Sequence, residues 1–409
     1  MTKINLFLFI DSEDLSVLLK RPKSFNRIFL SLQKFFSKCI VINISKIIGE
    51  KVKNNNFKKI LSEDNIDYFC PRNSKELNNR INKKDKNYGQ FKANFNLKYY
   101  KILRILNKSK IRLIQVNPRS FIFENNSLSG KPIKDSLKII FNIRLINYFH
   151  RIMCGLGLYP KIHIHFDCDQ KRIDLINSSL SKKIDKYFPI IKFSYYKKII
   201  RINSENYSDF IKLKKHKIED KYITLLDEPL AHPDYTIREG VVDYKKKEIY
   251  YESLILLLKK IQKTFNKKVI ICLHPKAEYH HFKNFKLLQK NFKTVYYKTE
   301  YYISKSFLIL NAISSTMNHA IIQNKPVFII KSQHFANVAN DKIKYIKKEL
   351  NFPIINVDNF NKQNFKNLLD HKNKNKDKKK IELYKKNRLF FEQNVNYLNQ
   401  VINYLKEND

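Results

Sequence analysis

Short apolar runs alternate with amphipathic helical patterns through the second half of the chain. The runs lie at 222–226 (YITLL), 269–273, 293–297, 307–310, 326–330 (PVFII) and 353–357. Helical spacing separates them, as in the series Tyr250, Leu254, Leu257, Leu258, Ile261 and Phe265, and again at about 280–290 and from about 360. Uninterrupted apolar strands alternating with helices are typical of a parallel sheet covered on both faces. The pattern predicts a doubly wound, Rossmann-like domain over roughly 220–370.

The first half repeats this pattern less regularly. Strands are expected at 4–10, 39–44, 66–69, 111–116 and 161–166, helices at about 25–36, 95–108 and 135–149, and polar loops at 50–59 and 82–90. A chain of 409 residues suits two domains. The predicted fold class is therefore α/β, with two Rossmann-like domains facing a cleft and a C-terminal helix. The predicted boundaries are 1–210 for the acceptor-side domain, 211–372 for the nucleotide-binding domain, and 373–409 for a charged segment and the C-terminal helix.

An apolar stripe at helical spacing follows the charged segment, formed by Phe391, Val395, Leu398, Ile402 and Leu405. A stripe so far from the domain core must be buried against another surface. Two interpretations stay open: the helix crosses back to the first domain, or it packs on a partner protein.

The formal charge of +43 would suit a polyanionic partner such as nucleic acid. Lys, Asn and Ile are enriched throughout, however, as in proteins of A/T-rich genomes, and the charge is not gathered in one arm. We therefore expect no nucleic-acid partner, with peripheral contact to an anionic inner membrane as a secondary effect. Five cysteines without a CxxC pair, and no apolar run of about 18 residues, favour a cytoplasmic protein.

Two polar motifs follow predicted strands of the second domain. His274-Pro275 comes directly after the run 269–273, where the proline ends the ladder and presents a histidine that could donate to phosphate. Ser314-Ser315-Thr316 comes after 307–310 and opens a helix, where free backbone N–H groups and three hydroxyls could hold an anion. Each has a plain alternative, a histidine at a strand end and a hydroxyl N-cap. Ligands of doubly wound sheets bind outside the carboxyl ends of the strands, which is where both motifs are expected.

The ordered series of His-Pro, Ser-Ser-Thr and Lys325-Pro326 resembles bacterial GT-B glycosyltransferases of surface-polysaccharide synthesis. It is most similar to the sialyltransferase and polysialyltransferase group, over about residues 220–335. In that group the histidine and the serine pair hold the phosphate of a CMP-activated sugar. The resemblance implies that role for His274 and for Ser314, Ser315 and Thr316, with Pro275 and Lys276 beside them. It also implies a metal-independent reaction that needs no cofactor besides the nucleotide-sugar donor.

The general base is left open. The group carries two acidic residues followed by glycine, and this chain has no clean copy, because proline follows Asp227-Glu228. Other carboxylates follow strands of the first domain: Asp11 and Glu13 after the first strand, and Asp167 and Asp169 after 161–166. His232 lies in the same titratable segment as Asp227. That segment is equally consistent with an interdomain loop. Asp167 and Asp169 follow a first-domain strand and are interpreted as a loop, not as a metal-binding DxD.

The sequence thus favours a glycosyltransferase that moves a sugar, with a CMP-sugar favoured, to a surface glycan acceptor such as capsule or lipopolysaccharide. The alternatives are a nucleotide-sugar epimerase or a noncatalytic polysaccharide-assembly protein of the same fold, and less favoured, a nucleic-acid-binding protein.

Overall fold

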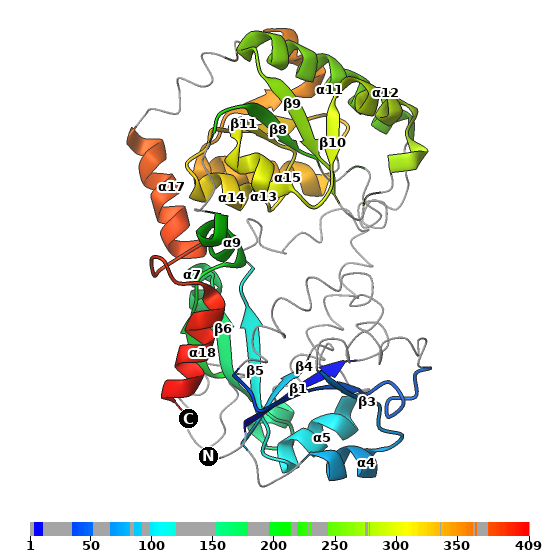
Figure 1. Ribbon diagram of the computed structural model, residues 1–409, viewed down its shortest axis with the longest axis vertical. Helices are drawn as coiled ribbons and strands as arrows, with labels where there is room; N and C mark the ends of the chain where they lie inside the picture. The colour runs from blue at the N-terminus through cyan, green and yellow to red at the C-terminus, as the bar shows by residue number, and fades with distance from the viewer. Residues whose placement is uncertain are drawn as a thin grey trace. The chain divides into compact units, whose positions relative to one another are not determined.

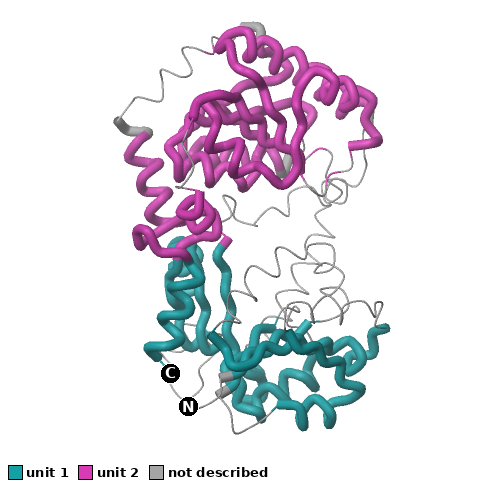
Figure 2. The backbone as a smooth tube through the Cα atoms, in the orientation of Figure 1, with its two compact units in different colours: residues 1–118, 137–202, 397–409 teal, residues 119–136, 203–396 magenta. Residues whose placement is uncertain are grey.

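The computed structural model describes fifteen segments of the chain, and every structural statement below concerns these residues. They are 4–10, 35–51, 66–81, 86–91, 99–119, 152–178, 196–213, 219–227, 230, 244–274, 277, 279–335, 337–362, 365 and 375–408. The chain divides into two compact units (Figure 2). Unit 1 comprises 1–118, 137–202 and 397–409, and unit 2 comprises 119–136 and 203–396.

Unit 1 is built on a seven-stranded parallel sheet of order β3-β2-β1-β4-β5-β6-β7 (Figure 1). Its strands are β1 (Ile4–Ile10), β2 (Lys38–Asn43), β3 (Asp67–Phe69), β4 (Lys86–Phe91), β5 (Arg112–Asn117), β6 (Ile162–Asp167) and β7 (Tyr196–Arg201), and its helices α4 (Ser74–Arg80), α5 (Tyr100–Lys108), α7 (Gln170–Asn177) and α18 (Tyr397–Glu407). Side chains of β1 alternate between two cores, because successive residues of a strand point to opposite faces. Leu6 and Leu8 pack in the cluster that includes α18, and Phe7 packs in the one that includes α4 and α5.

Unit 2 is built on a six-stranded parallel sheet of order β10-β9-β8-β11-β12-β13. Its strands are β8 (Tyr222–Leu226), β9 (Lys268–Cys272), β10 (Lys293–Val295), β11 (Ser306–Asn311), β12 (Val327–Lys331) and β13 (Ile354–Asn356). Its helices are α9 (Glu205–Leu213), α11 (Tyr244–Phe265), η2 (Tyr279–His281), α12 (Lys283–Asn291), α13 (Thr299–Ser304), α14 (Met317–Ile322), α15 (Asn337–Leu350), η3 (Val357–Lys362) and α17 (Asn375–Arg388). Both sheets have the strand order of doubly wound Rossmann folds, so the predicted fold class of two Rossmann-like domains is confirmed.

Strand β4 corrects the sequence analysis, which expected a polar loop at 82–90. Its Asn87 and Gln90 are buried although polar, and Asn5 Nδ2 donates to Asn87 Oδ1 at 3.1 Å. Gly89 is needed because an added Cβ would lie 2.7 Å from Cγ2 of Ile111. A central strand with buried polar side chains, one of them bonded to the neighbouring strand β1, carries no apolar run, which is why hydropathy misses it.

The C-terminal part differs from the single segment 373–409 that the sequence suggested. Helix α17 belongs to unit 2, where Tyr384 joins the core, and α18 belongs to unit 1. Of the predicted stripe, Ile402 and Leu405 are buried on α18, while Phe391 is 47% exposed and precedes the helix. Of the two interpretations left open, the structure shows the crossing back to the first domain. No helix in the described part of the chain combines the length and the apolar character needed to cross a membrane.

Candidate functional site

Three of the predicted site segments follow neighbouring strands of the unit 2 sheet. Asp227 follows β8, His274 comes two residues after β9, and Ser314–Thr316 follow β11. Since β8 lies between β9 and β11 and all three are parallel, these residues share the carboxyl edge of one sheet, with β9 and β11 about 10 Å apart. The strand order reverses between β8 and β11, and this switch point is where doubly wound sheets bind ligands.

Asp227 is a buried carboxylic acid at this switch point. It is only 7% exposed, and its backbone N–H donates to the carbonyl of Cys272 at 3.1 Å, which fixes it to the end of β9. Burial raises the pKa of Asp227 to about 6, although a hydrogen bond from the Tyr279 hydroxyl opposes the rise. An acid with a pKa near neutrality can both accept and return a proton at physiological pH.

Tyr279 connects Asp227 to the His-Pro segment. Its hydroxyl accepts from the backbone N–H of His274 at 3.0 Å and is hydrogen-bonded to the Asp227 side chain. The ring is held by stacking on Phe285, with centroids 4.2 Å apart. Tyr279 thereby holds the backbone of His274 in place, while the His274 side chain stays partly exposed. No signal in the sequence marks Tyr279, because it reaches the site from η2, which carries no motif.

The Ser314–Thr316 turn is tightly bonded within itself. Ser314 is 7% exposed, its Oγ lies 2.9 Å from Thr316 Oγ1, and its N–H donates to Asn311 Oδ1 at 2.8 Å. The free N–H groups expected at the helix start are engaged instead, because those of Met317 and Asn318 donate to Ser314 and Ser315 carbonyls at 3.3 and 3.2 Å. Helix α14 has only six residues, so its dipole is short. An anion here would be held by the half-buried Ser315 and Thr316 hydroxyls.

Ile313, directly before this turn, has a φ of 98°. Positive φ is strained for a β-branched residue, and such strain clusters at ligand-binding and catalytic sites. The side chain is nevertheless buried, at 3% exposure, so packing holds the strained backbone. This turn is thus kept in an unfavourable conformation where the sheet edge would meet a ligand.

Five predicted site residues lie outside the described residues: Asp11, Glu228, His232, Pro275 and Lys276. Asp11 directly follows β1, and Glu228 directly follows Asp227. Their proposed roles stay predictions.

Asp167 and Asp169 have structural partners. Asp167 ends β6, and its carboxylate accepts from Arg172 at 2.7 and 2.9 Å and contacts His165 Nε2 at 3.1 Å. Burial raises its pKa, but the hydrogen bonds from His165 and Arg172 outweigh burial and hold the pKa below its usual value. Asp169 caps α7 by accepting from the Lys171 N–H at 3.1 Å. These contacts explain the DxD pattern by local structure.

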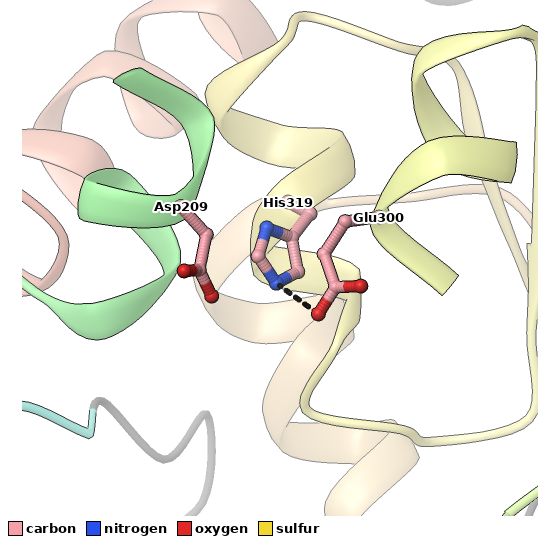
Figure 3. A group of neighbouring side chains, drawn as sticks. All are labelled: Asp209, Glu300 and His319. Atoms are coloured by element: carbon pink, nitrogen blue, oxygen red, sulfur yellow. Dashed lines mark ion pairs between the residues drawn. The ribbon is translucent and has the colours of Figure 1, made fainter. Parts of the chain in front are cut away.

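A second group of chemistry-bearing side chains lies among three helices of unit 2 (Figure 3). It is formed by Asp209 on α9, Glu300 on α13 and His319 on α14, and one ligand atom from each lies within 4.8 Å of the others. No motif in the sequence marked these residues, since they come from three separate segments.

Comparison with known proteins finds a likeness of fold. No protein-family model matches the sequence, and no curated protein is significantly similar to it. Similar solved structures include the UDP-GlcNAc 2-epimerase from Methanocaldococcus jannaschii, with 13% identity and a TM-score of 0.45 over 99% of each chain. The calicheamicin glycosyltransferase CalG4 gives 6% and 0.48 over 99% of this chain and 98% of its own. The wall teichoic acid polymerase TagF gives 12% and 0.44 over 99% and 89%. At these values the likeness assigns no activity to this chain.

Proposed function

We propose that the protein is a glycosyltransferase whose unit 2 binds the nucleotide part of an activated sugar at the carboxyl edge of its sheet. The observation that carries the proposal is the shared edge: a near-neutral carboxylic acid, a partly exposed histidine and two half-buried hydroxyls follow three adjacent strands. They flank the switch point at which doubly wound sheets bind nucleotides. Among donors, a CMP-sugar is favoured by the resemblance of the His-Pro and Ser-Ser-Thr series.

In the proposed reaction His274 donates a hydrogen bond to the donor phosphate and stabilises the negative charge that develops as the glycosidic bond breaks. Ser315 and Thr316, which follow β11, bind the same phosphate from the other side of β8. Asp227 accepts the proton of the acceptor hydroxyl, because its raised pKa suits general-base catalysis near neutral pH. The acceptor is proposed to be a surface glycan.

Nucleotide binding measured by calorimetry tests this assignment. We expect His274→Ala and Ser315→Ala each to weaken binding of the preferred nucleotide among CMP, UDP and GDP by at least ten-fold, since each removes a contact to a charged phosphate. The matched controls are His281→Ala, an exposed histidine on η2, and Ser178→Ala, an exposed serine of unit 1. Both should bind as the unaltered protein does. Equal affinity of all five proteins for every nucleotide would exclude this edge as the site.

A nucleotide-sugar 2-epimerase is the second candidate, favoured by one observation. Asp227 titrates near pH 6, and a group of that pKa can both remove and return a proton on a bound sugar. Incubation with UDP-GlcNAc, followed by chromatography of the products, separates the two. An epimerase yields UDP-ManNAc, or UDP and an altered free sugar, without an acceptor, whereas a transferase consumes its donor only when an acceptor glycan is present.

A further inference from the structure

The group formed by Asp209, Glu300 and His319 sits where α9, α13 and α14 pack together, one turn of α14 beyond Thr316, whose carbonyl accepts from the His319 N–H at 3.0 Å. In Figure 3 the imidazole lies between the two carboxylates, and Nε2 of His319 is 3.7 Å from Oε1 of Glu300. The His319 side chain is 3% exposed, and that of Glu300 is 34% exposed. The group therefore has a buried nitrogen and an outer, solvent-reachable side.

Nε2 of His319 lies near both an amide and a carboxylate. Asn206, three residues before Asp209 on α9, places Nδ2 at 2.9 Å from His319 Nε2. The donor and acceptor roles depend on the tautomer of the ring, and a neutral ring that carries its proton on Nδ1 has a lone pair on Nε2 that can accept an amide N–H or bind a metal ion. The ligand atoms of Asp209, Glu300 and His319 lie within 4.8 Å of one another, and a cation between them would be attracted to both carboxylates.

Three ligand atoms at this separation can close on one ion. First-row divalent cations bind imidazole nitrogen and carboxylate oxygen at about 2.0–2.2 Å, so two ligands of a tetrahedral ion lie about 3.4 Å apart. The Nε2–Oε1 separation of 3.7 Å is near that value, and the other separations, which are within 4.8 Å, would shorten by up to about 1.4 Å on binding. A turn of the Asn206 amide would present Oδ1 in place of Nδ2, as a fourth ligand or as a partner of a bound water.

We propose that Asp209, Glu300 and His319 form a site for a divalent transition-metal ion, with Zn²⁺ as the representative. One imidazole and two carboxylates suit Zn²⁺ or Mn²⁺ better than Mg²⁺, which prefers oxygen ligands alone. The ion joins α9 to α13 and α14, and the exposed side of Glu300 leaves a coordination position open to water. This inference does not depend on the proposed function, and it departs from the metal-independent chemistry that the sequence resemblance implies.

Zn²⁺ uptake by the full-length protein tests the proposal. The protein is stripped with a chelator, exchanged into buffer at pH 7.5, and titrated with ZnCl₂ by calorimetry, with metal content measured after gel filtration. His280 and His281 form an exposed neighbouring pair, with centroids 3.8 Å apart, and could bind Zn²⁺ on their own. The double variant His280→Ala/His281→Ala is therefore the background for every measurement.

In that background we expect one equivalent of Zn²⁺ per chain and at least ten-fold weaker binding in His319→Gln, Glu300→Gln and Asp209→Asn. Glu382→Gln on α17, whose side chain is 64% exposed, is the matched control and should bind as the background does. Equal uptake by the background and by His319→Gln, or no stoichiometric uptake by the background, would overturn the proposal.

Thermal melting of the stripped protein, with and without Zn²⁺, gives a second readout. If acceptor atoms face one another, Asp209→Asn and Glu300→Gln relieve repulsion and should leave the Tm of the stripped protein unchanged or raised, while Zn²⁺ raises the Tm of the background alone. If a protonated His319 instead bridges the carboxylates, both variants lower the Tm of the stripped protein and Zn²⁺ has no effect. The second pattern refutes the metal site and identifies an ion pair.

Discussion

Replacing Asp227 by asparagine should make the stability of the protein less sensitive to pH. The folded protein raises the pKa of this carboxyl from 3.8 to about 6, so between these values the native state holds a proton that the unfolded chain has lost. Stability then falls as pH rises through this window, and the penalty is complete above about pH 7. A difference of about 2 pKa units corresponds to about 3 kcal/mol. Asparagine is never ionised and keeps an oxygen to accept from Tyr279, so it escapes the penalty.

About half of this penalty develops between pH 5 and pH 8, which amounts to about 1.4 kcal/mol. For a domain of this size that free energy corresponds to about 3–5 °C in Tm. Thermal melts of both proteins at pH 5, 6, 7 and 8 measure this effect. The Tm of Asp227→Asn minus the Tm of the unaltered protein should increase by about 3–5 °C between pH 5 and pH 8. The proposed transferase activity should fall at the same time, because the general base is lost.

The control is Asp341→Asn on α15, a carboxylate 48% exposed. It removes the same charge from the same unit, and its Tm should track the unaltered protein at every pH. Parallel curves for Asp227→Asn as well would show that Asp227 is ionised without penalty in the folded protein. The assignment of a near-neutral acid to the switch point would then be wrong.

Three further outcomes are expected. Tyr279→Phe removes a hydrogen bond that lowers the pKa of Asp227, so the acidic limb of a pH–activity profile should move to higher pH. An acidic limb at unchanged pH would show that Tyr279 does not set the pKa of the catalytic group. Gly89→Ala brings a Cβ within 2.7 Å of Ile111 and should cost about 1–3 kcal/mol, measured as a lower midpoint of urea unfolding. Asp167→Asn should cost about 1.5–3 kcal/mol at neutral pH by removing the charge that Arg172 and His165 bind. Because the folded pKa of Asp167 lies below 3.8, its contribution is present above pH 3.8 and lost as pH falls further, so melts of the two proteins should converge in acid.

Most of unit 2 could be predicted from the sequence, because its strands are buried on both faces and read as uninterrupted apolar runs. Unit 1 was harder for the opposite reason. Strand β4 is central but polar, and its buried Asn87 accepts from Asn5 of β1, so the strand has the polar sequence of a loop. Strand β7 lies at the sheet edge and carries Lys197 and Lys198. Lysines are common on edge strands, and they interrupt the apolar pattern by which a strand is predicted.

The candidate site follows the same division. His274, Asp227 and the Ser314–Thr316 turn were marked in the sequence because each comes directly after a buried strand. Tyr279 could not be predicted, since it meets Asp227 only through the path of the chain after β9. The strain at Ile313 is equally invisible, because a positive φ leaves no trace in the residue type.

The assignment of α18 to unit 1 bears on how this polypeptide acquires its structure during synthesis. Tyr397, Val401 and Ile402 supply part of the core on one face of a sheet whose first strand is β1, so that core stays incomplete on the ribosome until all of unit 2 has been translated. The sheet and the core of unit 2 can fold before the core of unit 1 is complete. Nonsense mutations or purification tags near the end of α18 would then impair the folding of unit 1, although most of unit 1 is encoded at the start of the message.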